Sequence, residues 1–256
     1  MSEVKSFRVR KSSIYNKDTS TPFKISRSKF FDFLNCKRCF YLDRVKGLKE
    51  PSTPPYTLNN TVDELLKKEF DIFRSKQKPH PIMIKNKLDF VPFEHKDLNT
   101  WRNSLKGGIS YLDKNTNLIL HGGIDDIWFD LKKKELVVVD YKAQSSNYPV
   151  AVTSYLDSTW RRSYKLQMDI YVYILRKMKL KVSNLSYFLV CNAEKNINSF
   201  NENITFKTYL IPYSTNTLWI ESQIIKMKKL LDSDRIPEIN LFCEKCAYLK
   251  GAKKYF

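Results

Sequence analysis

Two spacings of hydrophobic residues recur along this chain, one typical of helices and one typical of strands. The helical spacing of three to four residues predicts four helices. They run from residue 26 to the first cysteine pair, and over residues 57–75, 158–180 and 215–234. Ser26 is the expected cap of the first helix, and Asn60 or Thr61 that of the second, because their side-chain oxygens can accept from unpaired backbone N–H groups.

The strand-like spacing of two residues, or a short apolar run, predicts five strands. They lie at residues 117–122, 122–130, 135–143, 184–192 and 203–212. The first three follow in quick succession, and residues 131–135 suit a hairpin turn, so these strands are expected to form a meander. Prolines and mixed periods over residues 76–115 indicate decoration rather than core.

Composition adds that the chain is globular and strongly basic. Of its 256 residues, 42% are hydrophobic, which is enough for one compact core and argues against disorder. Residues 1–24 are basic and rich in Ser and Thr, so we expect a flexible arm before a single domain over residues 25–256. The formal net charge of +18 favours nucleic acid as a partner, although a lysine-rich genome would give the same excess.

The N-terminal sequence lacks the apolar core of a signal peptide. No later stretch approaches the roughly 20 apolar residues that span a bilayer. We therefore expect a cytoplasmic protein that does not enter a membrane.

Acidic and basic side chains fall on two consecutive predicted strands. Asp125 and Asp126 lie in one, and Asp140 and Lys142 follow the apolar run of the next. Side chains two residues apart on a strand share a face, so Asp140 and Lys142 point the same way. Oxygens of Asp125 and Asp140 suit Mg²⁺ or Mn²⁺, and the Lys142 ammonium can neutralise charge on a phosphate under attack. Alternatively, Asp140 and Lys142 form a strand-end ion pair, and Asp125 and Asp126 belong to a turn.

These residues resemble the motifs of the PD-(D/E)XK nucleases, in particular the RecB-like branch that includes the CRISPR-associated iron–sulfur exonucleases. Residues 122–125, GGID, match the family's G-x-(I/V)-D motif, and residues 140–142, DYK, match its (D/E)-x-K motif. Gln167 and Tyr171 match the Q-x-x-x-Y of the next helix. The resemblance extends from residue 26 to the C-terminus. It implies an α/β fold with a restriction-endonuclease-like core, in which helices flank a central mixed β-sheet and the cysteine-bearing ends of the chain pack together.

The resemblance also implies roles for single residues. Gln167 and Tyr171 would face the active site, whereas the alternative is that they fill a polar gap and pack in the core. The family's metal-binding histidine on the first core helix is replaced by Asp63, an oxygen ligand that would favour Mg²⁺. Alternatively, Asp63 and Glu64 complement the positive end of that helix. The expected catalytic residues are Asp125, Asp140, Lys142, Gln167 and Tyr171, and the expected metal ligands are Asp63, Asp125 and Asp140.

Four of the five cysteines form two Cys-x-x-Cys pairs, Cys36 with Cys39 and Cys243 with Cys246. Their spacing indicates a four-thiolate site at which the two ends of the chain meet. Zn²⁺, an iron–sulfur cluster, or reduced thiols without a metal are all compatible with it. The resemblance implies a [4Fe-4S] cluster, although the family divides its cysteines one and three rather than two and two. Cys191 follows an apolar strand and is expected in the core.

Basic and aromatic residues precede Gln167, namely Trp160, Arg161, Arg162 and Lys165. They suit contacts with the backbone and bases of DNA, or else a solvated helix start. The sequence thus predicts a Mg²⁺- or Mn²⁺-dependent deoxyribonuclease that acts like an exonuclease on single-stranded or end-containing DNA. The resemblance suggests DNA repair, recombination or defence against mobile elements as its setting. The alternatives are a non-catalytic nucleic-acid-binding module with a cysteine-bound structural metal, and a zinc-stabilised interaction protein.

Overall fold

A computed structural model shows a mixed α/β fold in two compact units, and it describes residues 5–255. The first unit comprises the described residues up to 54, residues 111–121 and those from 218 on. The second comprises residues 55–110 and 122–217. The single domain expected over residues 25–256 stays a prediction. In the described part of the chain, no helix combines the length and the apolar character that a membrane crossing requires.

A three-stranded sheet and short helices build the first unit. The sheet has the order β1-β4-β3, in which β1 (Phe23–Ser26) runs parallel to β4 (Leu118–Gly122) and β3 is Ile109–Asp113. The helices are α1 (Arg27–Asn35), α2 (Lys37–Arg44), α7 (Ile220–Leu231), α8 (Glu244–Ala252) and the 3-10 turns η1 (Lys11–Ser13) and η4 (Lys253–Tyr255). Ser26 caps α1 as predicted, because its hydroxyl accepts from the backbone N–H of Lys29 at 3.3 Å. The rings of Phe30, Phe33 and Phe40 form the buried centre of this unit.

The described part of the N-terminal segment makes specific contacts inside the first unit. Arg8 forms an ion pair with the buried Asp43 at 2.5 Å, and the Tyr15 hydroxyl donates to Asp232 at 2.6 Å. Lys17 pairs with Asp234 at 2.8 Å on the surface. The flexibility expected of residues 1–24 is not tested by these contacts and stays a prediction.

A five-stranded mixed sheet forms the second unit, with the order β2-β5-β6-β7-β8. Its strands are β2 (Phe90–Pro92), β5 (Asp126–Asp130), β6 (Glu135–Ser145), β7 (Leu185–Ala193) and β8 (Phe206–Ser214). Only the β6–β7 pair is parallel among these neighbours. The helices are α3 (Thr57–Ser75), α4 (Pro81–Lys85), α5 (Leu98–Arg102), α6 (Arg162–Lys177) and the 3-10 turns η2 (Tyr155–Asp157) and η3 (Thr159–Arg161).

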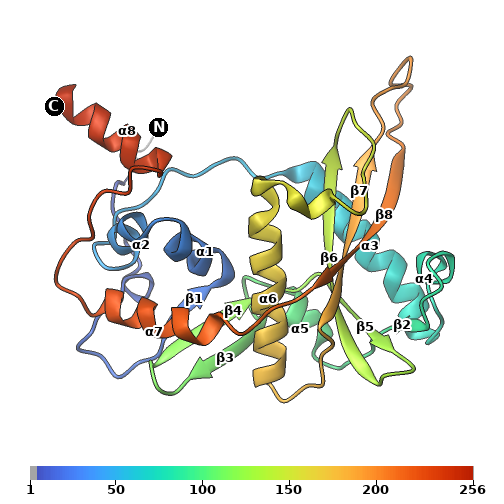
Figure 1. Ribbon diagram of the computed structural model, residues 1–256, viewed down its shortest axis with the longest axis horizontal. Helices are drawn as coiled ribbons and strands as arrows, with labels where there is room; N and C mark the ends of the chain where they lie inside the picture. Colours follow the sequence, from blue (N-terminus) through green and yellow to red (C-terminus); the bar gives the residue numbers. More distant parts are fainter. Residues whose placement is uncertain (1–4, 256) are drawn as a thin grey trace. The chain divides into compact units, whose positions relative to one another are not determined.

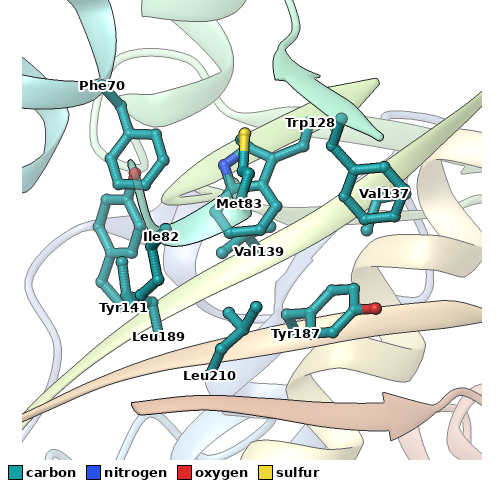
Figure 2. Close-up of a cluster of buried hydrophobic side chains, with 11 residues drawn as sticks. Phe70, Ile82, Met83, Trp128, Val137, Val139, Tyr141, Tyr187, Leu189 and Leu210 are labelled. Atoms are coloured by element: carbon teal, nitrogen blue, oxygen red, sulfur yellow. The ribbon is translucent and has the colours of Figure 1, made fainter. Parts of the chain in front are cut away.

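Strand β6 has two different faces, which pack against different helices of this unit. Val137, Val139 and Tyr141 point into an apolar cluster with Phe70 of α3 (Figure 2). The residues between them point to the opposite face, where α6 crosses the sheet (Figure 1). Asp140 and Lys142 are on this second face, so the alternation of side chains along the strand alone directs both of them toward α6.

Several expectations from the sequence need correction. Strand β4 pairs with β1 in a separate sheet, so only β5 and β6 form the expected hairpin and the three-stranded meander is wrong. Helix α3 has the predicted bounds, but Tyr56 occupies its cap position without a side-chain bond, and Asn60 and Thr61 lie inside the helix.

Residues 76–115 contribute to the core, although the sequence indicates that they lie outside it. They supply the edge strand β2 and, through Ile82, Met83 and Phe90, part of the apolar cluster. Helices and strands of three to five residues are too short to establish a periodic pattern, which is why the sequence does not reveal them.

Candidate active site and cysteine cluster

Asp125 lies beside the pair formed by Asp140 and Lys142. It immediately precedes β5, and its Oδ2 accepts from the backbone N–H of Tyr141 on β6 at 2.8 Å. Tyr141 stands between Asp140 and Lys142, whose carboxylate and ammonium form an ion pair. Asp140 is fully buried, and 15% of the Lys142 side chain is exposed. The two acidic groups and the amine that the sequence singles out therefore meet at one place.

The electrostatics of this place favour a bound cation. Burial raises the pKa of Asp125 to about 7, and the negative charge of Asp140 adds to the shift. Burial alone would lower the pKa of Lys142, but the charges of Asp140 and Asp125 outweigh it, so this pKa is raised and the ammonium keeps its proton. Two buried carboxylates with oxygen donors and one ammonium suit a hard divalent ion such as Mg²⁺ or Mn²⁺.

Helix α6 contributes the residues that hold Asp140 in place. The Gln167 side-chain amide donates to Asp140 Oδ1 at 2.5 Å and lies 3.2 Å from the Tyr171 hydroxyl. Both residues are buried on the face of α6 that covers the site. One turn earlier, the Tyr164 ring lies 4.6 Å from the Lys142 ammonium, a contact that sequence reasoning missed.

Asp63 of α3 is near this site but has a partner of its own. Its Oδ2 forms an ion pair with Lys67 at 2.5 Å, one helical turn away. Burial raises the pKa of Asp63, and the charge of Asp125 contributes to the shift, which requires the two carboxylates to be close. Asp63 therefore lies near enough to Asp125 for the two charges to interact, and Lys67 partly neutralises Asp63.

The expected nucleic-acid residues lie in η3 and in the first turn of α6, and they differ in exposure. Trp160 is 86% exposed, and Arg162 is also exposed. Arg161 instead donates to the backbone oxygen of Tyr155 at 2.5 Å and lies 3.7 Å over that ring. Lys165 is half-buried. Trp160 and Arg162 are thus available to a ligand, whereas Arg161 holds the loop before the helix.

In the first unit, the four cysteines of the two Cys-x-x-Cys pairs converge. The Sγ atoms of Cys36 and Cys246 are 3.6 Å apart, and that of Cys39 is 3.7 Å from both Cys243 and Cys246. Over residues 5–255, they are the one group of three or more possible ligands whose donor atoms all lie within 4.8 Å of one another. The group can bind a metal ion, and Cys191 lies apart from it in β7 as expected.

Both pairs occupy the same position on a helix. Cys36 and Cys243 are the N-cap residues of α2 and α8, and Cys39 and Cys246 are the third residues of these helices. The positive end of each helix dipole favours thiolates. Burial nevertheless raises the pKa of Cys36 and of Cys39, so these thiols keep their protons unless a metal displaces them.

Comparison with known proteins decides the family. A model of the PD-(D/E)XK nuclease superfamily matches residues 24–250. The chain belongs to this superfamily. A solved crystal structure from Eubacterium rectale, described as a "putative exonuclease", is 14% identical, covers 88% of this chain and 87% of its own, and has a TM-score of 0.44. No curated protein matches the sequence significantly.

A buried network that sequence reasoning missed connects the two strands that carry the PD-(D/E)XK motifs, β5 and β6. The carboxylate of Asp126, which is fully buried, accepts from Arg74 at 2.5 Å and from Arg102 at 2.9 Å. The Tyr141 hydroxyl donates to its other oxygen at 2.8 Å. Tyr141 therefore holds Asp125 through its main chain and Asp126 through its side chain. The only signal in the sequence was the Asp125–Asp126 doublet.

The Tyr141 hydroxyl is expected to contribute measurably to stability. Tyr141→Phe leaves one oxygen of a fully buried carboxylate without its donor, which should lower the free energy of unfolding by about 1–3 kcal/mol. Tyr187→Phe is the matched control, because Tyr187 is buried in the same apolar cluster and its hydroxyl has no hydrogen-bond partner in the described part of the chain. Urea unfolding of both variants measures the difference, and equal losses would contradict the role given to Tyr141.

Proposed function

We propose that this protein is a nuclease that hydrolyses DNA phosphodiester bonds with Mg²⁺ or Mn²⁺ as its cofactor. The observation that carries the proposal is the 2.8 Å bond between Asp125 and the backbone of Tyr141, which places Asp125 next to Asp140 and Lys142. Membership of the PD-(D/E)XK superfamily supports hydrolysis of phosphodiesters, and the net charge of +18 supports a polyanionic substrate.

The residues of the site would divide the chemistry as follows. Asp125 and Asp140 would hold the divalent ion, with Asp63 as a further oxygen ligand once its ion pair with Lys67 opens. A bound ion of this kind makes a water a better nucleophile and offsets negative charge on the phosphate. The Lys142 ammonium would contact a phosphate oxygen while the bond from phosphorus to water forms and the bond to the leaving oxygen breaks. Gln167 fixes the orientation of Asp140.

Single-stranded or end-containing DNA is the proposed substrate, cut in the manner of an exonuclease. Support comes from the exposed Trp160 in η3 and the exposed Arg162 at the first position of α6, seven and five residues before Gln167. An exposed indole stacks on unpaired bases, and a neighbouring guanidinium binds the backbone. Paired bases inside a closed duplex do not offer that stacking surface.

Cleavage assays test this function directly. The protein is incubated with a labelled single strand, a linear duplex and a covalently closed plasmid, each in Mg²⁺, Mn²⁺ or EDTA. The single strand should be degraded from its ends in either metal and remain intact in EDTA, whereas the closed plasmid should persist. Asp140→Asn is the control, since it removes a ligand charge without changing side-chain size. Binding without cleavage in either metal would favour a non-catalytic module.

We propose further that the cysteine group binds one tetrahedral ion such as zinc. A bond of about 2.3 Å from zinc to each sulfur gives edges of about 3.8 Å in a regular tetrahedron. The observed separations of 3.6 and 3.7 Å agree with this. In a [4Fe-4S] cluster each thiolate binds a different iron and points outward, so the four sulfurs lie farther apart. The sulfur spacing thus supports the zinc alternative over the cluster that the family resemblance implies.

A further inference from the structure

A hollow of about 490 Å³ lies in the second unit between α3 and the segment that contains α5. Most of the residues that line it have polar or charged side chains, and both signs of charge are present. Helix α3 contributes Glu64, Lys67, Lys68 and Asp71 to the lining, and the segment around α5 contributes Asn99, Arg102 and Asn103. The hollow is open to solvent.

Several hydrogen-bond donors in this hollow have no partner in the described part of the chain. The Lys68 ammonium and the Asn99 amide make no hydrogen bond or ion pair there, and both side chains are exposed. Asn103 uses its Oδ1 to accept from two backbone N–H groups of the following loop, at 3.2 and 3.0 Å, which leaves its NH₂ group free. Donors that converge without acceptors suit a ligand rich in acceptor oxygens.

The acidic residues of the lining reduce the positive charge of the hollow only slightly. Asp71 accepts from Arg102 at 2.9 Å through both oxygens, and from Arg74 at 2.9 Å, so its charge is neutralised within the protein. Glu64 is exposed and can turn to solvent. The charge left for a ligand is therefore mainly that of Lys68, with Lys67 beside it.

Two residues that line the hollow also contact residues of the candidate active site. Lys67 lines the hollow and also pairs with Asp63 at 2.5 Å. Arg102 lines it and donates through Nε to the backbone oxygen of Asp125 at 3.2 Å. A third contact joins the motif to the lining, because a Cβ added to Gly123, two residues before Asp125, would lie 2.8 Å from the Cβ of Ser104.

We propose that this hollow binds a backbone phosphate of the nucleic-acid strand, adjacent to the phosphate that is cut. The inference rests on the proposed function, because it takes the active site as the place where the strand is held. Lys68 supplies the charge, and the amides of Asn99 and Asn103 supply directed donors to the phosphate oxygens. The hollow reads no base and therefore acts on every sequence alike.

Equilibrium binding tests the proposal without requiring cleavage. A fluorescein-labelled single-stranded DNA is titrated in EDTA at several salt concentrations, and anisotropy gives the observed association constant. The test variant is Lys68→Gln with Asn103→Asp. The new carboxylate keeps the oxygen that accepts from the loop, and it replaces the free NH₂ group with an oxygen that repels phosphate. The control is Lys76→Gln with Lys78→Gln, two exposed residues at and just beyond the end of α3 that change the net charge by the same amount.

The test variant should bind roughly 10-fold more weakly at about 0.1 M salt, and its salt slope should fall by about one, as expected for one lost phosphate contact. The control should keep the slope of the unchanged protein. Equal slopes in the two double variants would overturn the proposal. The proposed function would fail in a different way, through absence of metal-dependent cleavage by the unchanged protein, while the difference in slope remained.

Discussion

Lys142→Ala is expected to lower metal-dependent DNA cleavage by about 10³-fold or more, the loss that follows removal of a group that stabilises charge in the transition state. The Lys142 ammonium forms an ion pair with Asp140 and lies next to the Tyr164 ring. The rate of product formation with a labelled single strand in Mg²⁺ measures the effect.

Two further variants distinguish a loss of catalysis from a loss of folded protein in this experiment. Lys142→Met keeps the aliphatic part of the side chain against Tyr164 and removes only the ammonium, so it should lose activity as fully as Lys142→Ala. Lys132→Ala removes a lysine from the exposed turn between β5 and β6 and should remain active. Thermal unfolding shows whether each variant is folded. Full activity in a folded Lys142→Met protein would exclude the proposed mechanism.

Cys246→Ala should abolish metal binding at the cysteine group and strongly destabilise the first unit. Cys246 is buried, and its Sγ lies within 3.7 Å of both cysteines of the first pair. Structural zinc contributes on the order of 10 kcal/mol to folding in zinc-finger peptides, so the loss should reach several kcal/mol even in a unit with its own apolar core. Elemental analysis of the purified protein and thermal unfolding are the measurements.

Cys191→Ala is the control for that experiment. Cys191 is a buried thiol on β7 outside the metal-binding group, so its removal should leave the metal content unchanged. One zinc per chain and no visible colour would agree with a single tetrahedral ion. Broad absorption at about 400 nm together with several irons per chain would instead establish an iron–sulfur cluster and refute the single-ion proposal.

Much of the fold follows from local patterns in the sequence. Helix α3 begins and ends at the predicted residues, and β6 and β7 are recognisable because each carries a long apolar run. The three-stranded sheet of the first unit could not be predicted. Strand β4 has the same alternation as a strand of the central sheet, and its pairing with β1 joins segments more than 90 residues apart, which no periodic pattern records.

The candidate site shows the same division between local and distant contacts. The shared direction of Asp140 and Lys142 follows from the two-residue period of a strand, and the spacing of Gln167 and Tyr171 follows from one helical turn. The partners of Asp126 come from segments 24 and 52 residues earlier, so neither Arg74 nor Arg102 is marked in the sequence. Their positions depend on how α3 and α5 pack against the sheet.

The two cysteine pairs lie at the starts of α2 and α8, so the cysteine group can form only late in the synthesis of the protein. Cys36 and Cys246 are 210 positions apart, so a ribosome must translate all the residues between them before the second pair can join the first. The continuous stretch from residue 122 to residue 217 is complete earlier and contains Asp125, Asp140 and Lys142. A chain cut short after residue 240 would thus carry these three residues and only half of the thiols that close its first unit.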